Sequence, residues 1–174
     1  MSARRVLAAG LLAASLGGCG FHPLYGDFGA TAETADKLAA IYVEPIPDKL
    51  GYELRNTLID LFDASGRPSA GAYRLRVRLG TKSEGIAIQN DAAITRYNDT
   101  LTVAYELTDT ATGTLVTKGT ETGLSAYNVV SSPYATLVAQ QDADKRAAED
   151  IAYRIRTDLA VYFAQAPRAT PKKR

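Results

Sequence analysis

The chain has 174 residues, 20 of them Lys or Arg and 19 of them Asp or Glu, and its formal net charge at pH 7 is +1. A balance this close to neutral supplies no global basic field, which argues against a nucleic-acid-binding protein. The single cysteine, Cys19, and the single histidine, His22, predict no disulfide, no metal site and no cofactor, and they disfavour a Ser/His/Asp triad or a His-Cys pair.

The first 18 residues are typical of a secretory signal peptide, with an arginine pair at 4–5, an apolar run over 6–16 and small residues next. The run is too short for a transmembrane helix, which needs about 20 apolar residues. Leu-Gly-Gly directly before Cys19 resembles a bacterial lipobox, in which the thiol is acylated and the cysteine becomes the first residue. We therefore expect removal of residues 1–18 and lipidation at Cys19, leaving 156 residues with a net charge of −1. An ordinary signal peptide with an incidental cysteine and a twin-arginine export signal are the alternatives.

Residues 19–39 are predicted to be a lipidated N-terminus and linker, because glycine and proline recur and small polar residues follow. The β-branched and aromatic run at 40–43 predicts a first strand, which two prolines end. We expect a helix next, capped by Asp48, because leucines recur at helical spacing over 50–61. An amphipathic helix of this size is a core element.

The clearest strand pattern covers residues 73–79 and carries a row of cations. Apolar residues alternate there with Arg74, Arg76 and Arg78, so the arginines share one face, and Lys82 joins them if the strand continues without a bulge. Two interpretations stay open. The row is either a solvated strand face whose arginines pair with neighbouring carboxylates, or a surface that recognises a polyanion. Side chains about 7 Å apart and the bidentate geometry of arginine suit the second interpretation.

Two longer strands and a long helix follow. Alternation predicts strands over 93–108 and 114–124, joined as a hairpin by a turn. A serine pair followed by Pro133 is typical of a helix start, and the helix is expected to run to about residue 166. Its acidic residues, Asp144 among them, have the spacing of a solvated, ion-paired helix face.

The element order βαβββα predicts one α+β domain over residues 40–166. Two amphipathic helices need an apolar face to cover, so we expect a two-layer sandwich with both helices on one face of a four-stranded antiparallel (mixed) sheet. Residues 167–174 form a basic tail with two prolines, which is expected to be disordered.

Three segments resemble the lipopolysaccharide-assembly lipoproteins of the LptE family. They are Gly20–Gly26 directly after the lipobox, the block Ser125–Ala135, and Asp142–Ala148. The predicted element order is also similar to that family's two-helix, four-strand sandwich. The resemblance covers nearly the whole mature chain.

The resemblance implies a non-enzymatic lipoprotein, anchored on the periplasmic face of the outer membrane. Such proteins help a large, LptD-like β-barrel translocon to fold, plug it, and bind lipopolysaccharide on its way to the cell surface. It also implies that basic residues contact lipopolysaccharide, and the residues that could serve here are Arg74, Arg76, Arg78, Lys82 and Arg96. A periplasmic lipoprotein module that binds peptidoglycan or another envelope complex is the alternative. A small hydrolase is disfavoured, because the usual site residues are missing.

Overall fold

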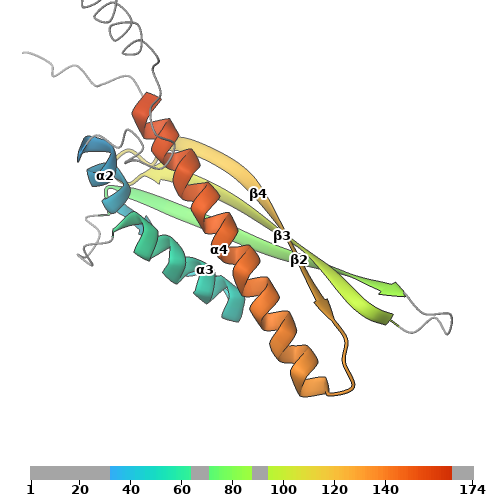
Figure 1. The fold of residues 1–174 in the computed structure, drawn as a ribbon. Coiled ribbons are helices and arrows are strands. Elements are labelled where there is room, and N and C mark those ends of the chain that lie inside the picture. The colour runs from blue at the N-terminus through green and yellow to red at the C-terminus, as the bar shows by residue number, and fades with distance from the viewer. Residues whose placement is uncertain (1–31, 64–70, 88–93, 166–174) are drawn as a thin grey trace, which may run out of the picture.

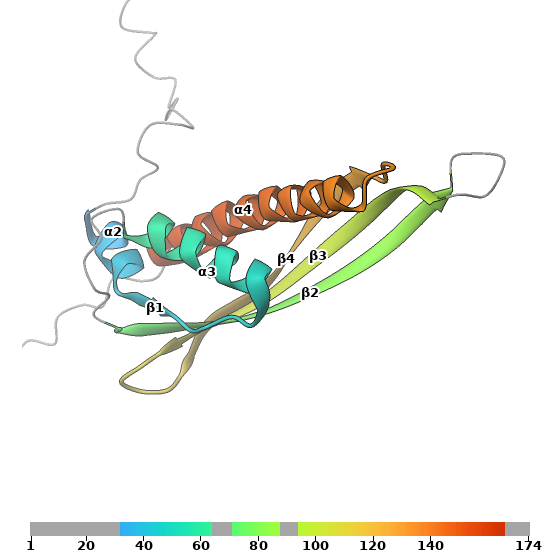
Figure 2. The same ribbon diagram turned by 90° about the horizontal axis from the view of Figure 1, so that it is seen from below.

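The computed structural model describes residues 32–63, 71–87 and 94–165. Within them a sheet forms one layer and helices form the other, as Figure 1 and Figure 2 show. The elements in chain order are α2 (Ala32–Ala39), β1 (Ile41–Val43), α3 (Asp48–Phe62), β2 (Tyr73–Ala87), β3 (Ile94–Asp109), β4 (Leu115–Asn128) and α4 (Pro133–Gln165).

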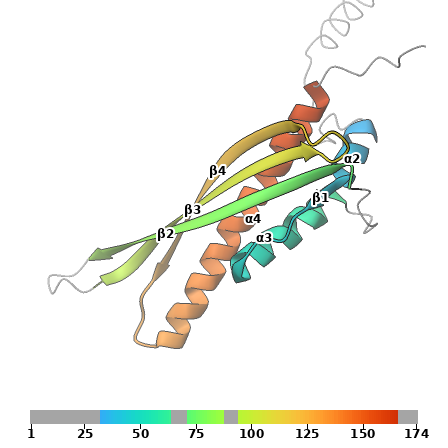
Figure 3. The ribbon, with the colours of Figure 1, turned by 180° about the vertical axis from the view of Figure 1, so that it is seen from behind.

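The sheet is mixed, with the strand order β1-β2-β3-β4. The short β1 runs parallel to β2, with Ile41 opposite Tyr73, and the other neighbours are antiparallel. The register of β2 against β3 is regular until it shifts between Ile86 and Ala87. Figure 3 shows the sheet from the side that none of these helices covers, which we call the outer face. β2 and β3 extend well beyond α3 toward the start of α4 (Figure 2).

The apolar core lies between the inner face of the sheet and helices α3 and α4. The alternation of the strands is the cause, because one side of β3 supplies only apolar and aromatic side chains and all four are buried: Leu101, Val103, Tyr105 and Leu107. The helices contribute buried apolar stripes of their own. Those stripes include Leu54 and Leu58 of α3 and Ile151, Ile155 and Leu159 of α4.

A glycine sets how closely α4 approaches the sheet. Gly123 of β4 lies on the inner face, and a Cβ atom there would come within 2.9 Å of Ile151 Cδ1 and 3.2 Å of the Ala147 carbonyl oxygen. A larger residue would therefore push the helix backbone away from the strand. The contact fixes the distance between the two layers at this point.

The predicted α+β sandwich and its element order are confirmed, with two differences. The last eight residues of the expected linker at 19–39 form α2, which packs against α4 and adds the buried Leu38 to the core. Asp48 does not cap α3, because Pro47 occupies the cap position and makes no side-chain hydrogen bond. The signal peptide, Cys19, the rest of the linker and the basic tail lie outside the described residues. Among the helices of the described ranges, none is long and apolar enough to cross a membrane.

Candidate functional site

The basic row lies along the outer face of β2. Because the strand is regular through Ile86, Lys82 shares the face of Arg74, Arg76 and Arg78, and all four side chains are exposed. Arg96 of β3 lies on the same face, opposite Ile86 and nearer the end of the sheet that extends beyond α3. The structure therefore places all five predicted cations on one surface, with Arg96 apart from the other four.

Carboxylates neutralise three of the five cations. Glu44, just after β1, lies 3.0 Å from Arg76 Nε and 3.7 Å from Arg74 Nη1. Lys82 Nζ lies 2.7 Å from the Glu84 carboxylate. The hydrogen bond and the charge of Glu44 raise the pKa of Arg76, and those of Glu84 raise the pKa of Lys82. These three side chains fit the solvated-face interpretation.

Arg78 and Arg96 differ from the others, because neither makes an ion pair within the described residues. Arg78 lies opposite Ala104 and lines a shallow hollow with Arg76, Ala104 and Glu106. The Arg96 guanidinium donates only to amide oxygens, to Asn98 at 3.3 Å and to Asn128 at 3.4 Å. These two guanidinium groups keep charge available for an anion.

Exposed apolar side chains gather at the same end of the molecule as Arg96. We call this surface the apolar tip. It consists of Ile86, Ile94, Val129, Val130, Tyr134, Leu137 and Val138. Tyr134 is 76 % exposed, and the first buried residue of α4 is Ala143, so the first ten residues of the helix bury no side chain fully. This surface was not predicted from the sequence; the available signal was the lack of large apolar residues at 143, 147 and 148, where alanines stand in the buried stripe of the helix. Contiguous exposed apolar residues of this kind mark an interaction surface.

The acidic residues of α4 follow the predicted pattern with one exception. Asp142 pairs with Arg146, Glu149 with Lys145, and Asp150 with Arg154, each one helical turn apart. Asp144 instead turns toward the sheet, is partly buried, and accepts a hydrogen bond from Ser125 Oγ at 2.6 Å. The prediction of a solvated face is therefore wrong for Asp144, because α4 packs on β4 along this side.

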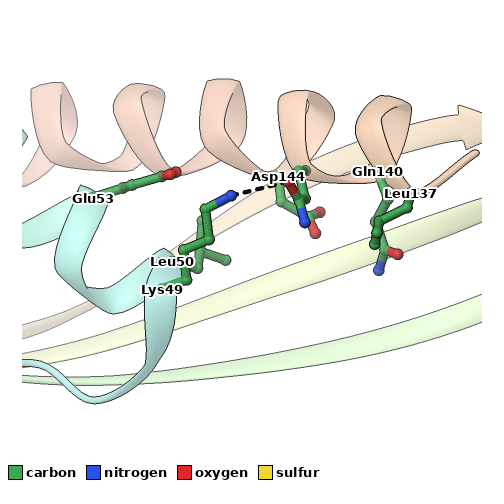
Figure 4. A pocket seen from close by; sticks show the side chains of 7 residues that line it. Lys49, Leu50, Glu53, Leu137, Gln140 and Asp144 are labelled. Atoms are coloured by element: carbon green, nitrogen blue, oxygen red, sulfur yellow. Dashed lines mark hydrogen bonds between the residues drawn. The ribbon is translucent and has the colours of Figure 1, made fainter. Parts of the chain in front are cut away.

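A cleft of about 260 Å³ opens between the start of α3 and α4 (Figure 4). Lys49 and Leu50 line one wall, and Leu137 and Asp144 line the other. Lys49 Nζ crosses the cleft and donates to Gln141 Oε1 at 2.9 Å. In the described ranges no group of three or more His, Cys, Asp or Glu side chains is placed to hold a metal ion. The cleft offers charge and apolar surface, but neither a histidine nor a cysteine.

Comparisons with known proteins give a family for the chain and similar solved structures for its fold. Residues 38–160 match the family model described as "LptE: Lipopolysaccharide-assembly". A lipoprotein of Caulobacter crescentus has a similar crystal structure, with a TM-score of 0.63 and 29 % identity over 77 % of this chain and 98 % of that one. A minor lipoprotein of Acinetobacter baumannii shares the fold, with a TM-score of 0.53 and 20 % identity over 70 % and 91 % of the two chains. An uncharacterised protein of Rickettsia prowazekii is 28 % identical over 126 residues, which cover 72 % of this chain and 78 % of that relative.

Proposed function

Because the chain belongs to the LptE family of lipopolysaccharide-assembly proteins, we propose that it scaffolds and plugs the β-barrel of the lipopolysaccharide translocon, an LptD-like protein. In this proposal the chain is a non-enzymatic lipoprotein, held on the periplasmic face of the outer membrane by lipid at Cys19. It assists lipopolysaccharide assembly at the cell surface.

The arrangement of the domain supports a tethered plug. The residues that follow Cys19 lead into α2, which lies beside the C-terminal end of α4, whereas the apolar tip lies at the opposite end (Figure 1). The 33 residues of α4 span about 50 Å at 1.5 Å per residue. A domain tethered at one end can therefore present its tip far from the membrane surface that holds the lipid, inside a lumen that surrounds it.

Contact with lipopolysaccharide is supported by Arg78 and Arg96, the two cations of the outer face without an ion-paired carboxylate. Guanidinium groups bind phosphate oxygens in a bidentate manner. Arg96 also lies directly opposite Ile86 of the apolar tip. A cation next to exposed apolar side chains matches an amphiphile that carries both phosphate groups and acyl chains. This juxtaposition is the observation that carries the ligand assignment.

The test is the affinity of the unlipidated protein for purified lipopolysaccharide. The double variant Arg78→Glu/Arg96→Glu reverses the two charges without an ion-paired carboxylate, both on the outer face and away from the core, so the fold should be kept while binding weakens. Loss of the charge-assisted contacts predicts a roughly ten- to hundredfold higher dissociation constant. Lys145→Glu/Arg146→Glu on α4 is the matched control, since it also reverses two exposed charges, on the other layer.

Unchanged affinity in the folded double variant would show that the basic row is an ordinary solvated strand face. The alternative function, a module that binds peptidoglycan or another envelope complex, uses the same cations against an acidic polymer. Sedimentation with isolated peptidoglycan separates the two. Co-sedimentation that depends on Arg78 and Arg96, without lipopolysaccharide binding, would favour the alternative.

A further inference from the structure

A row of polar side chains crosses the inner face of the sheet where the apolar core ends. Ser83, Asp99 and Ser125 lie directly opposite one another on β2, β3 and β4. Asp144 of α4 covers the row from the helix layer. Ser83 Oγ donates to Asp99 Oδ1 at 2.5 Å, and Ser125 Oγ donates to Asp144 Oδ1 at 2.6 Å. Four elements of the fold therefore meet at two carboxyl groups.

One carboxylate oxygen in this row has no donor. Asp99 is 0 % exposed, and its Oδ2 atom has no hydrogen-bond partner among the described residues. Each serine hydroxyl has a single proton, which is already donated, so neither serine can satisfy this atom. A buried carboxylate oxygen without a donor is strongly unfavourable. Asp144 reaches the row through Ser125, which lies directly opposite Asp99, so a proton on the Asp144 carboxyl group would supply the missing donor.

The charges around the pair do not supply a cation for it. Across the cleft, α3 presents Lys49, whose ammonium group binds Gln141, and the acidic Glu53. The sheet presents Ser83, Ser125 and the stacked rings of Tyr97 and Tyr127. Within the described ranges no Lys or Arg forms a salt bridge with either Asp99 or Asp144.

Asp99 raises the pKa of two acidic groups beside it, Asp144 and Tyr127. Burial and the nearby Asp99 carboxylate raise the pKa of Asp144, against the hydrogen bond from Ser125, which lowers it. Burial and the charge of Asp99 also raise the pKa of the Tyr127 phenol. A proton retained on Asp144 removes the repulsion between its carboxyl group and the charge of Asp99.

We propose that Asp99 and Asp144 share one proton, donated by Asp144 to Asp99 Oδ2, and that this bond latches the first third of α4, residues 133–144, onto the sheet. Ala143, next to Asp144, is the first buried residue of α4, so the latch lies where the helix leaves the core. The ten residues before it, 133–142, have no comparable anchor in the core and carry part of the apolar tip. Loss of the proton leaves two neighbouring carboxylates and frees this first third of the helix.

The sign of the pH dependence follows from the raised pKa of Asp144. The folded state holds the proton above the pH at which the unfolded chain has lost it, so the latch is complete in acid. Its contribution falls as pH rises from the ordinary pKa of Asp144 to the raised one, and stays constant above that. The helix start and the tip should therefore become more mobile as the pH rises.

The test is amide hydrogen exchange of the purified mature protein, compared as protection factors between about pH 4 and about pH 9. Protection of residues 133–144, relative to the centre of α4, should fall by about tenfold for each unit by which the folded-state pKa of Asp144 exceeds its ordinary value. Asp144→Asn carries amide protons that can replace the shared one, so protection in this variant should be constant across the range. Asp142→Asn, on the exposed face two residues away, is the matched control and should behave like the parent protein.

Protection of 133–144 that is constant with pH in the parent protein would overturn the proposal, and so would pH-dependent loss that persists in Asp144→Asn. Asp99→Asn is the second variant should Asp144→Asn fail to fold, because its amide can donate to the Asp144 carboxylate and should also remove the pH dependence. If calcium restores protection at high pH in the parent protein but not in either variant, the pair is a metal site rather than a proton-sharing latch.

Discussion

Two glycines on opposite faces of the sheet provide a matched test of the two-layer packing. Gly123 of β4 faces α4, and Gly80 of β2 lies on the outer face, where an added Cβ would meet nothing within 4 Å. Replacement by alanine adds the same methyl group at both positions and lowers the entropy of the unfolded chain in the same way. Any difference between the two variants therefore reports the space around each site in the folded protein.

The distances set the expected magnitudes. At Gly123 the new methyl group lies 2.9 Å from Ile151 Cδ1, which can rotate, but also 3.2 Å from the Ala147 carbonyl oxygen, which moves only with the helix. Overpacking of this kind lowers the free energy of unfolding by about 1–3 kcal/mol. Gly80→Ala should instead raise it by about 0.5–1 kcal/mol, because a strand glycine is replaced without a clash.

The assay is urea denaturation of the unlipidated mature protein, monitored by circular dichroism. Midpoints are compared between variants whose free energy of unfolding depends on urea concentration with the same slope. The account predicts a lower midpoint for Gly123→Ala and an equal or higher midpoint for Gly80→Ala. If Gly123→Ala proved as stable as the parent protein, the close approach of α4 to β4 would be wrong. If both variants lost stability equally, the assignment of the two faces would be wrong.

Two further predictions concern a buried tyrosine and the lipid anchor. The Tyr105 hydroxyl donates to Asp158 at 3.0 Å, and burial together with Asp158 raises the pKa of this phenol above its ordinary value of 10. The folded state thus holds a proton that the unfolded chain loses, so stability should fall as the pH rises above about 10, and Tyr105→Phe should show a smaller fall in alkaline denaturation. The lipobox predicts that Cys19→Ser, which cannot be acylated, moves from the membrane pellet to the soluble fraction on cell fractionation. Retention in the membrane after this change would show that Cys19 is not the anchor.

The fold was predictable because its signals are local. The alternation over residues 73–79 and the repeated leucines of α3 specify buried faces without any knowledge of their partners. Helix α2 was missed because it offers one large core residue, Leu38, in a stretch of small and polar side chains. Its helix is stabilised by packing against α4, which no local pattern reveals.

The interactions of the candidate site depend on register, which the sequence does not specify. Glu44 neutralises Arg74 and Arg76 only because the parallel pairing of β1 brings the end of that strand beside them. The hydrogen bond from Ser125 to Asp144 joins a strand to a helix 19 positions later in the chain. The apolar tip is exposed because β2 and β3 extend beyond α3. This exposure depends on the relative lengths of the elements rather than on the residues of the tip.

The central claim is that this lipoprotein works inside a translocon barrel, and its most direct test is purification of the tagged protein from detergent-solubilised outer membranes. The account predicts that one large β-barrel protein co-purifies in near-stoichiometric amount and is identified by mass spectrometry. Recovery of the lipoprotein alone, or with peptidoglycan fragments, would contradict the proposed role as scaffold and plug.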